Sequence, residues 1–155
     1  MKRNQAGFTL IELIIVIVIL GILAVTAAPK FLDFGGDARK SVLQGVKGSL
    51  ESAGSLVYGK AIIAGVQGTE DTTVESIPVT FGYPKATAVA LNAAAELSDF
   101  TMGGAVAESI PGTPGQIRIG ESTDAITDTG ACYVLYTASS ADGDKPAISL
   151  VSTGC

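Results

Sequence analysis

The sequence predicts an α+β protein in which a long N-terminal helix, membrane-spanning in its first half, packs its second half on a small antiparallel sheet. Three observations lead to this fold. Residues 8–28 are almost entirely apolar, residues 30–60 alternate polar and apolar positions at helical spacing, and the C-terminal part holds short apolar runs separated by turn residues. At 155 residues and 47% hydrophobic content, the chain has room for one spanning helix and one compact domain.

The apolar run from Phe8 to Ala28 contains 21 residues and a single charge, Glu12. At a rise of 1.5 Å per residue, a helix of this length reaches about 31 Å, which matches the hydrocarbon core of a bilayer. Residues 1–7 carry Lys2 and Arg3 and no acid, so the positive-inside rule keeps them in the cytoplasm. We therefore expect everything after Pro29 to lie on the outer side of the membrane.

Glu12 is the anomaly of this helix, because a carboxylate inside lipid costs roughly 2.5–3.5 kcal/mol on insertion scales. It follows Phe8 by four residues, which is close enough to the helix end for its side chain to reach headgroups or the chain's own terminus. The alternative is a partner group that pairs with the carboxylate inside the membrane or the assembled protein. Both explanations stay open on the sequence.

Gly21 and Pro29 are the weak points of the apolar helix. Pro29 cannot donate a hydrogen bond to the carbonyl of Val25, and Gly21 costs about 1 kcal/mol relative to alanine in a helix interior. The interval between them is a candidate for local melting. A simple kink or a close-packing face of small residues explains the same pattern.

Residues 30–60 are predicted to continue as an amphipathic helix that emerges from the membrane. The apolar positions that define its buried side are Phe31, Ala38, Val42, Val46, Leu50, Ala53 and Val57. Ser41, Gly45 and Ser49 form a strip of small residues at a spacing of four, on which this chain's own sheet or another subunit can pack closely. Several glycines oppose the helix, so tertiary packing must stabilise it.

Residues 61–115 are predicted to connect this helix to the sheet. Within them, 61–78 lacks periodicity and is predicted to be a surface loop, 79–84 is a short apolar run with a turn, 86–97 is an alanine-rich helix, and 103–115 is a second loop. Three further runs, 116–119, 131–137 and 147–152, predict strands of an antiparallel sheet of about four strands. Asp142 and Asp144 flank Gly143 in a predicted hairpin turn with too few oxygen ligands for calcium.

The two cysteines, Cys132 and Cys155, both fall on the predicted outer side of the membrane. In an oxidising compartment they most simply form one disulfide, with two free thiols or a bridge between subunits as the alternatives. A disulfide closing this loop of 24 residues contributes about 3.4 kcal/mol by the chain-entropy estimate.

Charge and motif content exclude several classes of function. The formal charge is −5, and without Lys2 and Arg3 it becomes −7, from 8 basic and 15 acidic side chains. This acidic balance opposes nucleic-acid binding, which requires a basic footprint. The chain has no histidine and none of the common nucleophile, zinc or phosphate-loop motifs. We therefore predict a protein that is not an enzyme and that has no catalytic residue, cofactor or metal.

The run G-F-T-L-I-E at residues 7–12, placed between a short basic leader and an apolar helix, resembles the prepilin signature of type IV pilins. This resemblance implies cleavage after Gly7 by a prepilin peptidase, N-methylation of Phe8, and pairing of Glu12 with the terminal amine of a neighbouring subunit during assembly. It also implies that the interval from Gly21 to Pro29 unwinds when a subunit leaves the bilayer. Pilins commonly close a C-terminal loop with a disulfide, as Cys132 and Cys155 would.

The short leader and Phe8 resemble the type IVa subclass. Residues 28–39, 58–60 and 82–84 resemble in particular the mannose-sensitive haemagglutinin pilins. The implied layout is a leader (1–7), a transmembrane and filament-core helix (8–29), and a globular head (30–155), which comprises a helix half (30–60), an αβ loop (61–115) and a disulfide-closed sheet region (116–155).

The function that the resemblance implies is that of a major pilin, stored in the inner membrane with its head in the periplasm and then polymerised into an extracellular pilus for attachment and biofilm formation. Its expected partners are copies of itself, the prepilin peptidase, the pilus assembly machinery and, before assembly, the inner membrane. The alternatives are a type II secretion pseudopilin, which usually lacks the disulfide and often binds calcium, and a minor or DNA-uptake pilin. A single-span membrane enzyme is a third alternative, which lacks any visible catalytic constellation.

Overall fold

The computed structural model describes residues 8–106 and 114–155, with side chains described except at 28–33, 105 and 106. The predicted leader and most of the predicted loop at 103–115 lie outside the described residues. Contacts within the chain separate two compact units, residues 1–37 and 38–155. Each unit is considered by itself.

The described part of the first unit consists of Phe8, Thr9 and the first part of helix α1 (Leu10–Ala64). The large apolar side chains from Phe8 to Val25 are all exposed, with exposed fractions between 46% and 94%. Thr26 donates its hydroxyl to carbonyl oxygens of its own helix, at 3.3 Å from Ile22 and 3.0 Å from Leu23. A helix that is apolar on every side requires apolar surroundings from outside the chain. The predicted weak points, Gly21 and Pro29, both fall inside the bounds of α1.

In the second unit, α1 buries one side of the helix at a spacing of three and four residues. The buried positions are Leu43, Val46, Leu50, Ala53, Val57 and Ala61, all between 0% and 7% exposed. The predicted side was partly wrong, because Ala38 is exposed and Val42 is 44% exposed, while the neighbouring Leu43 is fully buried. Val42 and Leu43 are adjacent apolar residues, and either one lies three or four residues before Val46, so the helical spacing alone does not show which is buried. In the folded head it is Leu43 that packs in the core.

The strip at Ser41, Gly45 and Ser49 is not where α1 packs against its own sheet. Ser41 and Gly45 are exposed and Ser49 is half-buried. No atom outside the local helix lies within 4 Å of the position that a Cβ at Gly45 would occupy. Of the two predicted uses of this strip, packing on the chain's own sheet is therefore wrong, and a subunit contact stays a prediction.

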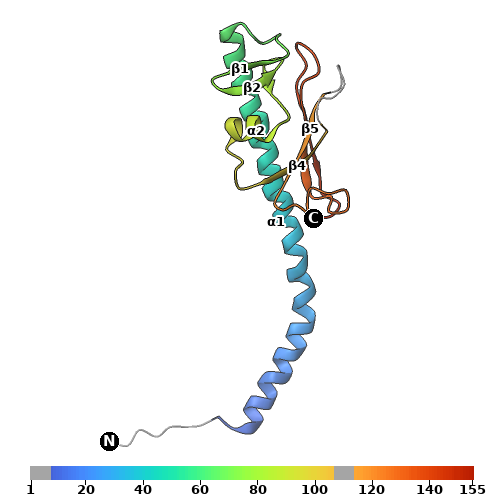
Figure 1. Ribbon diagram of the computed structural model, residues 1–155. Coiled ribbons are helices and arrows are strands. Elements are labelled where there is room, and N and C mark those ends of the chain that lie inside the picture. Colours follow the sequence, from blue (N-terminus) through green and yellow to red (C-terminus); the bar gives the residue numbers. More distant parts are fainter. Residues whose placement is uncertain (1–7, 107–113) are drawn as a thin grey trace, which may run out of the picture. The chain divides into compact units, whose positions relative to one another are not determined.

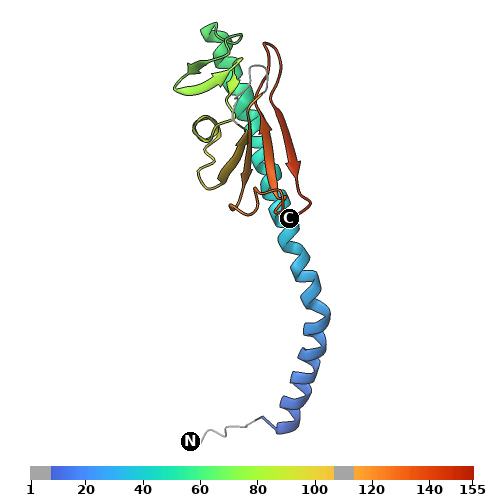
Figure 2. The same cartoon turned by 45° about the vertical axis from the view of Figure 1, so that its right-hand side comes forward.

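The main sheet of the second unit has four antiparallel strands in the order β4-β5-β6-β7. Its strands are β4 (Thr101–Val106), β5 (Gln116–Gly120), β6 (Tyr133–Thr137) and β7 (Ala147–Val151). Figure 2 shows the strands side by side along the part of α1 that belongs to this unit. The three predicted C-terminal strands and the antiparallel arrangement are confirmed.

The core of the second unit lies between this sheet and the buried side of α1. In the register of β5 and β6, Ile117 lies opposite Tyr136 and Ile119 opposite Val134, and all four side chains are at most 3% exposed. The same apolar cluster includes residues of α1 and of the segment around α2, namely Leu43, Val46, Leu50, Leu91 and Leu97. Burying side chains of this size stabilises the folded head by about 1.5–3 kcal/mol each.

Strand β4 corrects the prediction that residues 103–115 form a loop from their first residue. Gly103 and Gly104 suggested a break, but they are accommodated by a shift in the register between β4 and β5 after Gly103. Gly104 has a φ of +61°, which glycine adopts without strain. At Gly103, an added Cβ would lie 2.8 Å from Ile126 Cδ1, so the end of the Ile126 side chain would have to shift to accommodate any larger residue.

A second, three-stranded sheet corrects the prediction that residues 61–78 form a loop. It consists of β1 (Thr72–Val74), β2 (Ile77–Thr80) and β3 (Tyr83–Pro84). The β1–β2 turn has positive φ at both Glu75 and Ser76, and the β2–β3 turn has positive φ at Phe81 and Gly82. Two-residue hairpin turns need this conformation, which is usually marked by asparagine and glycine. Glu75 and Ser76 give no such signal, so the first hairpin could not be read from the sequence.

The short helix α2 (Ala88–Ala95) confirms the alanine-rich helix predicted at 86–97, with tighter bounds. Thr87 caps its N-terminus by accepting a hydrogen bond from the Ala90 amide at 3.2 Å. Glu96 ends the helix in the left-handed conformation, with a φ of 51°. Figure 1 shows α2 beside the part of α1 that belongs to the second unit.

Candidate functional site

The first turn of α1 holds the residues on which the functional hypothesis depends. Thr9 precedes the helix, and its carbonyl accepts the first intrahelical hydrogen bond, from the Leu13 amide at 3.3 Å. The Glu12 carboxylate turns back to Thr9, with Oε2 2.8 Å from the Thr9 amide nitrogen and 2.7 Å from the Thr9 hydroxyl. The Glu12 amide in turn lies 3.4 Å from the Thr9 hydroxyl oxygen. This reciprocal arrangement is a capping box.

The capping box gives Glu12 a partner in its own chain. Two donors, the amide and the hydroxyl of Thr9, meet the carboxylate, and both meet the same oxygen, Oε2. Within residues 8–106 and 114–155, no hydrogen bond to the other oxygen, Oε1, is recorded. A carboxylate has about four lone-pair sites, so Oε1 has capacity for a further donor. The geometry supports the explanation that Glu12 is satisfied locally and leaves room for a partner as well.

The surroundings of Glu12 are apolar. The segment Leu10–Ala27 is long and apolar enough to cross a membrane, with a mean hydropathy of 3.0 and no residue of it buried. Phe8, the predicted new N-terminal residue, is 94% exposed. Gly7, the predicted cleavage residue, lies outside the described residues. Phe8 therefore lies two residues before the start of α1 and Glu12 lies in its first turn, and their roles in processing and assembly stay predictions.

Thr9 is the residue at this site that sequence reasoning missed. The pattern Thr-x-x-Glu directly before an apolar run is the sequence signature of a capping box, and residues 9–12 match it. The anomaly of a charge in an apolar segment drew attention to Glu12 alone, although the signal for Thr9 was present.

The predicted disulfide between Cys132 and Cys155 is present, with a Cα–Cα distance of 4.9 Å. It joins the last residue of the chain to the residue that precedes β6. Around it the backbone packs very closely, because a Cβ on Gly154 would lie 1.9 Å from the Gly130 carbonyl oxygen. Gly154 is therefore required by this contact, and Gly130 by a different one, because a Cβ on Gly130 would lie 1.8 Å from the Asp124 carbonyl oxygen.

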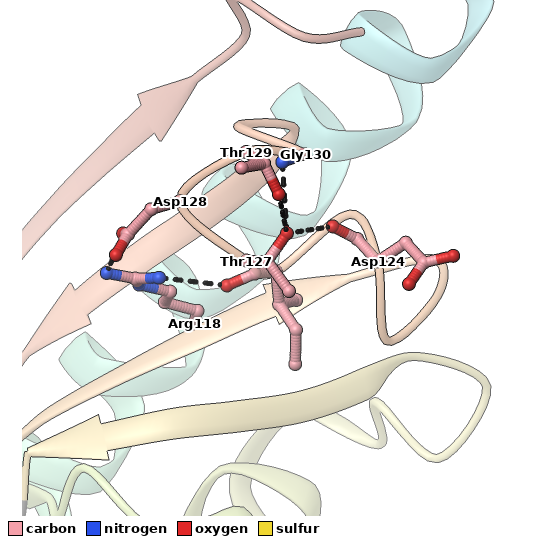
Figure 3. A network of polar contacts seen from close by, with 7 residues as sticks. Arg118, Asp124, Thr127, Asp128, Thr129 and Gly130 are labelled. Carbon is pink, nitrogen blue, oxygen red and sulfur yellow. Dashed lines mark hydrogen bonds and ion pairs between the residues drawn. The ribbon is translucent and has the colours of Figure 1, made fainter.

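A polar network holds the loop between β5 and β6 against the sheet (Figure 3). Arg118 on β5 contacts Asp128 at 2.6 Å and donates to the Ile126 carbonyl at 3.0 Å. Its guanidinium also lies 4.9 Å from the centre of the Tyr133 ring. Thr127 adds bonds inside the loop, donating to the Asp124 carbonyl at 2.7 Å and accepting from the Gly130 amide at 3.0 Å. These contacts fix the loop between β5 and β6, which ends at Cys132, one of the two cysteines of the disulfide.

An open hollow of about 420 Å³ lies beside the disulfide and is lined by residues that include Arg39, Glu121 and Asp124. Arg39 is already engaged there, at 3.8 Å from the Glu121 carboxylate and 3.5 Å from the Cys155 carbonyl oxygen. Among the described residues, no cluster of histidine, cysteine, aspartate or glutamate has the arrangement of a metal site. The predicted turn at Gly143 is present, with a φ of +84° and a hydrogen bond from the Asp144 amide to the Ala141 carbonyl at 3.1 Å.

Tyr136 is the most deeply placed titratable group of the head. Its side chain is 1% exposed, and its hydroxyl donates to the Pro84 carbonyl at 2.6 Å. Burial, with a smaller contribution from Tyr83, raises the pKa of Tyr136 well above its usual value. Burial also raises the pKa of Tyr83, whose ring stacks on Tyr58 with 4.6 Å between the ring centres. The hydrogen bond from Tyr136 to Pro84 connects β6 of the main sheet to β3 of the smaller sheet.

Comparison with known proteins first defines a class for the N-terminal segment. Residues 2–28 match the model of the prokaryotic N-terminal methylation motif. The match covers the predicted cleavage residues, the capping box and the apolar helix as far as Ala28.

The relatives are named as pilus and secretion subunits. The chain is 37% identical over 85 residues to a fimbrial protein of Pseudomonas aeruginosa, which is 55% of this chain and 53% of the relative. It is 54% identical over 46 residues to the type IV major fimbrial protein FimA of Dichelobacter nodosus, covering 30% of this chain and 28% of that protein. It is also 46% identical over 44 residues to the type II secretion system core protein G of Pseudomonas aeruginosa, covering 28% and 31%.

The chain thus spans between about a quarter and a half of the length of these relatives. No solved structure was found to match it. The relatives thus include fimbrial subunits and a type II secretion subunit, and this chain itself has a long apolar N-terminal helix and a small antiparallel sheet.

Proposed function

We propose that this chain is the major structural subunit of a type IV pilus, made as an inner-membrane precursor with its head in the periplasm and then polymerised into an extracellular filament. The observation that carries this proposal is the exposed apolar helix Leu10–Ala27 within a matched N-terminal methylation motif. Such a helix is stable in lipid as a monomer, and in a filament it becomes stable by packing against the same helix of other copies.

The proposal assigns a role to each predicted site residue. A prepilin peptidase cuts after Gly7 and methylates Phe8. The amine of Phe8 and the carboxylate of Glu12 pair between neighbouring subunits, because each charge alone is strongly penalised in a low-dielectric filament core. The interval from Gly21 to Pro29 loosens on assembly. The chain contributes contacts, and the assembly machinery supplies the work, so the subunit is not an enzyme.

A second candidate function is that of a type II secretion pseudopilin, which the match to a core protein G favours. The disulfide between Cys132 and Cys155 favours the pilus subunit, since pseudopilins usually lack that bridge. A minor or DNA-uptake pilin is the other alternative. The acidic balance of the chain, with 15 acidic and 10 basic side chains, opposes direct DNA binding.

We further propose the type IVa subclass and, within it, a filament of the mannose-sensitive haemagglutinin type that serves attachment and biofilm formation. The short leader, Phe8 and the segments 28–39, 58–60 and 82–84 support this finer assignment. Attachment to red cells that free mannose inhibits, lost in a strain lacking the chain, would support it. Attachment insensitive to mannose would leave a type IV pilus of another kind.

The experiment that tests the main proposal is electron microscopy of sheared surface material, with mass spectrometry of its main subunit, from the parent strain and a deletion strain. Filaments composed mainly of this chain, absent from the deletion strain and restored by complementation, are expected. Filaments that persist without the chain, or that contain it only in trace amounts, would overturn its role as the major subunit.

A further inference from the structure

Strand β7 forms an open edge of the main sheet. It is the last strand in the order β4-β5-β6-β7 (Figure 2), and its register with β6 is unbroken from Ala147 to Val151. The strand contains no charged residue and no proline. Among the described residues, β6 is the only strand recorded as pairing with it. Such an edge presents backbone groups with which a further strand can pair.

The opposite edge of the sheet, β4, is less suited to pairing. Its register with β5 shifts between Gly103 and Val106, and Gly104 has a φ of +61°. Irregularities of this kind bend an edge strand and interrupt its row of donors and acceptors. Strand β7 has no such interruption, so it is the edge at which this sheet can accept a strand.

The hydrogen bonds of β6 show which backbone groups of β7 face the open side. Gly115 and Ala138 continue the register of β5 and β6 by one residue, and the Ala138 amide donates to the Gly115 carbonyl at 2.9 Å. The backbone groups of successive residues in a strand point alternately to its two sides. The even-numbered residues of β6 therefore bond to β5, and the odd-numbered ones bond to β7.

The partners of the odd-numbered β6 residues are Ala147, Ser149 and Val151. Their amides and carbonyls are used inside the sheet, which leaves those of Ile148 and Leu150 on the open side. The side chains divide in a similar way. Ile148 and Leu150 pack against the apolar cluster of the head, whereas Ala147 and Ser149 are exposed on the other face of the sheet.

This pattern of backbone groups is self-complementary. When a second copy of β7 runs antiparallel beside the first, with Ser149 opposite Ser149, then Ile148 of each copy lies opposite Leu150 of the other. Each such pair exchanges two N–H···O bonds, as hydrogen-bonded pairs of antiparallel strands do. The outward amides and carbonyls of Ile148 and Leu150 are then all paired, and a two-fold axis passes between the two Ser149 residues.

Neighbouring registers satisfy fewer of these groups. A shift by two residues in one direction sets Leu150 opposite Pro146, which has no N–H to donate. A shift in the other direction sets Ile148 opposite Ser152, whose carbonyl already accepts a hydrogen bond from the Cys155 amide at 3.4 Å. The register centred on Ser149 is therefore the favoured one.

Charge does not oppose this pairing, although the chain is acidic overall, with a formal charge of −5. In the register centred on Ser149, Lys145 lies opposite Thr153, and residues 145–153 contain no acid. Like charges directly opposite each other destabilise paired strands, and this register places none together. The edge thus fits a second copy of itself in both hydrogen bonding and charge.

We infer that the open edge of β7 is a pairing surface for a second copy of this chain, which joins it antiparallel across a two-fold axis at Ser149. The pair uses residues of the head alone, so it is separate from the contacts of the apolar N-terminal helix. Copies within one proposed filament share a direction, whereas the two strands of this pair run in opposite directions. In assembled pili the pair would therefore join two filaments side by side.

The test is oxidative cross-linking of the full chain, purified in detergent, with one cysteine added on the exposed face of β7. In Ser149→Cys, the two added residues of a pair have Cα atoms about 4.5 Å apart, which a disulfide can bridge. Ala147→Cys is the matched control, because it lies on the same face of the same strand but is separated from its own copy by roughly 13 Å along the strands. Peptide mapping checks that Cys132 and Cys155 stay joined, and thermal unfolding checks that both variants fold.

We expect about tenfold more covalent dimer from Ser149→Cys than from Ala147→Cys, because only the former meets its own copy within disulfide range. A second measurement avoids added cysteines. In a mixture of Ser149→Lys and Ser149→Asp chains, a carbodiimide should couple the introduced lysine to the introduced aspartate. A mixture of Ala147→Lys and Ala147→Asp chains should give about tenfold less of the corresponding product, since those positions are too far apart.

Equal amounts of dimer from Ser149→Cys and Ala147→Cys, or no dimer from Ser149→Cys, would overturn the inference. So would a bridge from Ser149→Cys to a different protein, without the dimer, when intact cells are oxidised. These results do not depend on filaments, so they are distinct from a failure of the proposed function, in which the chain is absent from surface filaments.

Discussion

The two units of this chain differ in whether their large apolar side chains are buried within the chain. In residues 38–155, the apolar side of α1 meets a sheet of the same chain, and Leu43, Ile119 and Val134 are fully buried. In the described part of residues 1–37, every large apolar side chain up to Val25 is at least 46% exposed. The head contains its own core, whereas the N-terminal helix depends on what lies outside the chain. Substitutions in the head should therefore change stability, and substitutions at the N-terminal end should change assembly.

The largest expected effect is that of Glu12→Val. If Glu12 only satisfies its own helix end, this chain should insert and assemble normally, because valine suits lipid better than a carboxylate. We expect instead that Glu12→Val is processed, accumulates in the inner membrane and forms almost no surface filaments, since the incoming subunit loses the charge that sets its register. Counting filaments by electron microscopy in a strain that expresses only the variant measures this.

Glu51→Val is the control for that experiment, because Glu51 is an exposed acid of the same helix in the head, paired with Lys47 at 3.8 Å. It should assemble at near-normal levels. Normal filament numbers with Glu12→Val would contradict the assembly role of Glu12, whatever the control does.

The neighbours Leu43 and Val42 provide a sharp test of the head's core. Leu43→Ala should destabilise the head by about 2–5 kcal/mol, because Leu43 is fully buried and its truncation leaves a cavity. Val42→Ala should cost less than about 1 kcal/mol, because Val42 is 44% exposed. Thermal unfolding of the detergent-solubilised chain, followed by near-ultraviolet circular dichroism, measures both. Equal losses would mean that the buried side of α1 is assigned wrongly.

The disulfide should have an effect of similar size. Cys155→Ser should lower the stability of the head by about 3 kcal/mol, since the loop from Cys132 becomes free in the unfolded chain. The N-terminal helix should stay inserted, because no residue of the bridge belongs to it. Oxidised and reduced heads that melt at the same temperature would show that the bridge does not stabilise the fold.

Tyr136 gives the smallest effect and a dependence on pH. Its pKa is raised in the folded head, so folding favours the neutral phenol. This contribution is complete below the unfolded pKa of about 10 and is lost as the pH rises above that value. Above that pH, the stability of the unmodified head should fall more steeply than that of the Tyr136→Phe head. At neutral pH, Tyr136→Phe should lower the stability of the head by about 1 kcal/mol, because the hydrogen bond to the Pro84 carbonyl is lost. Parallel pH profiles for the two chains would contradict this assignment.

Much of the fold was predictable because it follows periodicity. The apolar run fixed the N-terminal helix, and the three C-terminal strands, the disulfide and α2 were found where their patterns placed them. Three features were not predictable for physical reasons. The turn of the β1–β2 hairpin is formed by Glu75 and Ser76, which are not typical turn residues. Strand β4 contains two glycines that are accommodated by a shift in register. Val42 and Leu43 both fit the helical spacing of the buried side, although only Leu43 is buried.

At the candidate site, the sequence was sufficient to single out Glu12 but its partner was overlooked. A charged residue in an apolar segment can be recognised from the sequence. That both donors of Thr9 bind the same carboxylate oxygen of Glu12 can be recognised only from the structure. In the proposed filament, contacts such as one at Gly45 would be made by other copies, and the contacts within a single chain therefore cannot show them.

The intact mass of the main subunit in sheared surface filaments is the most direct test of the proposed processing and assembly. We predict a chain from Phe8 to Cys155 with one added methyl group and with Cys132 and Cys155 joined in a disulfide. A mature chain that begins at Met1, or one cut beyond Ala28 so that the apolar helix is missing, would contradict it.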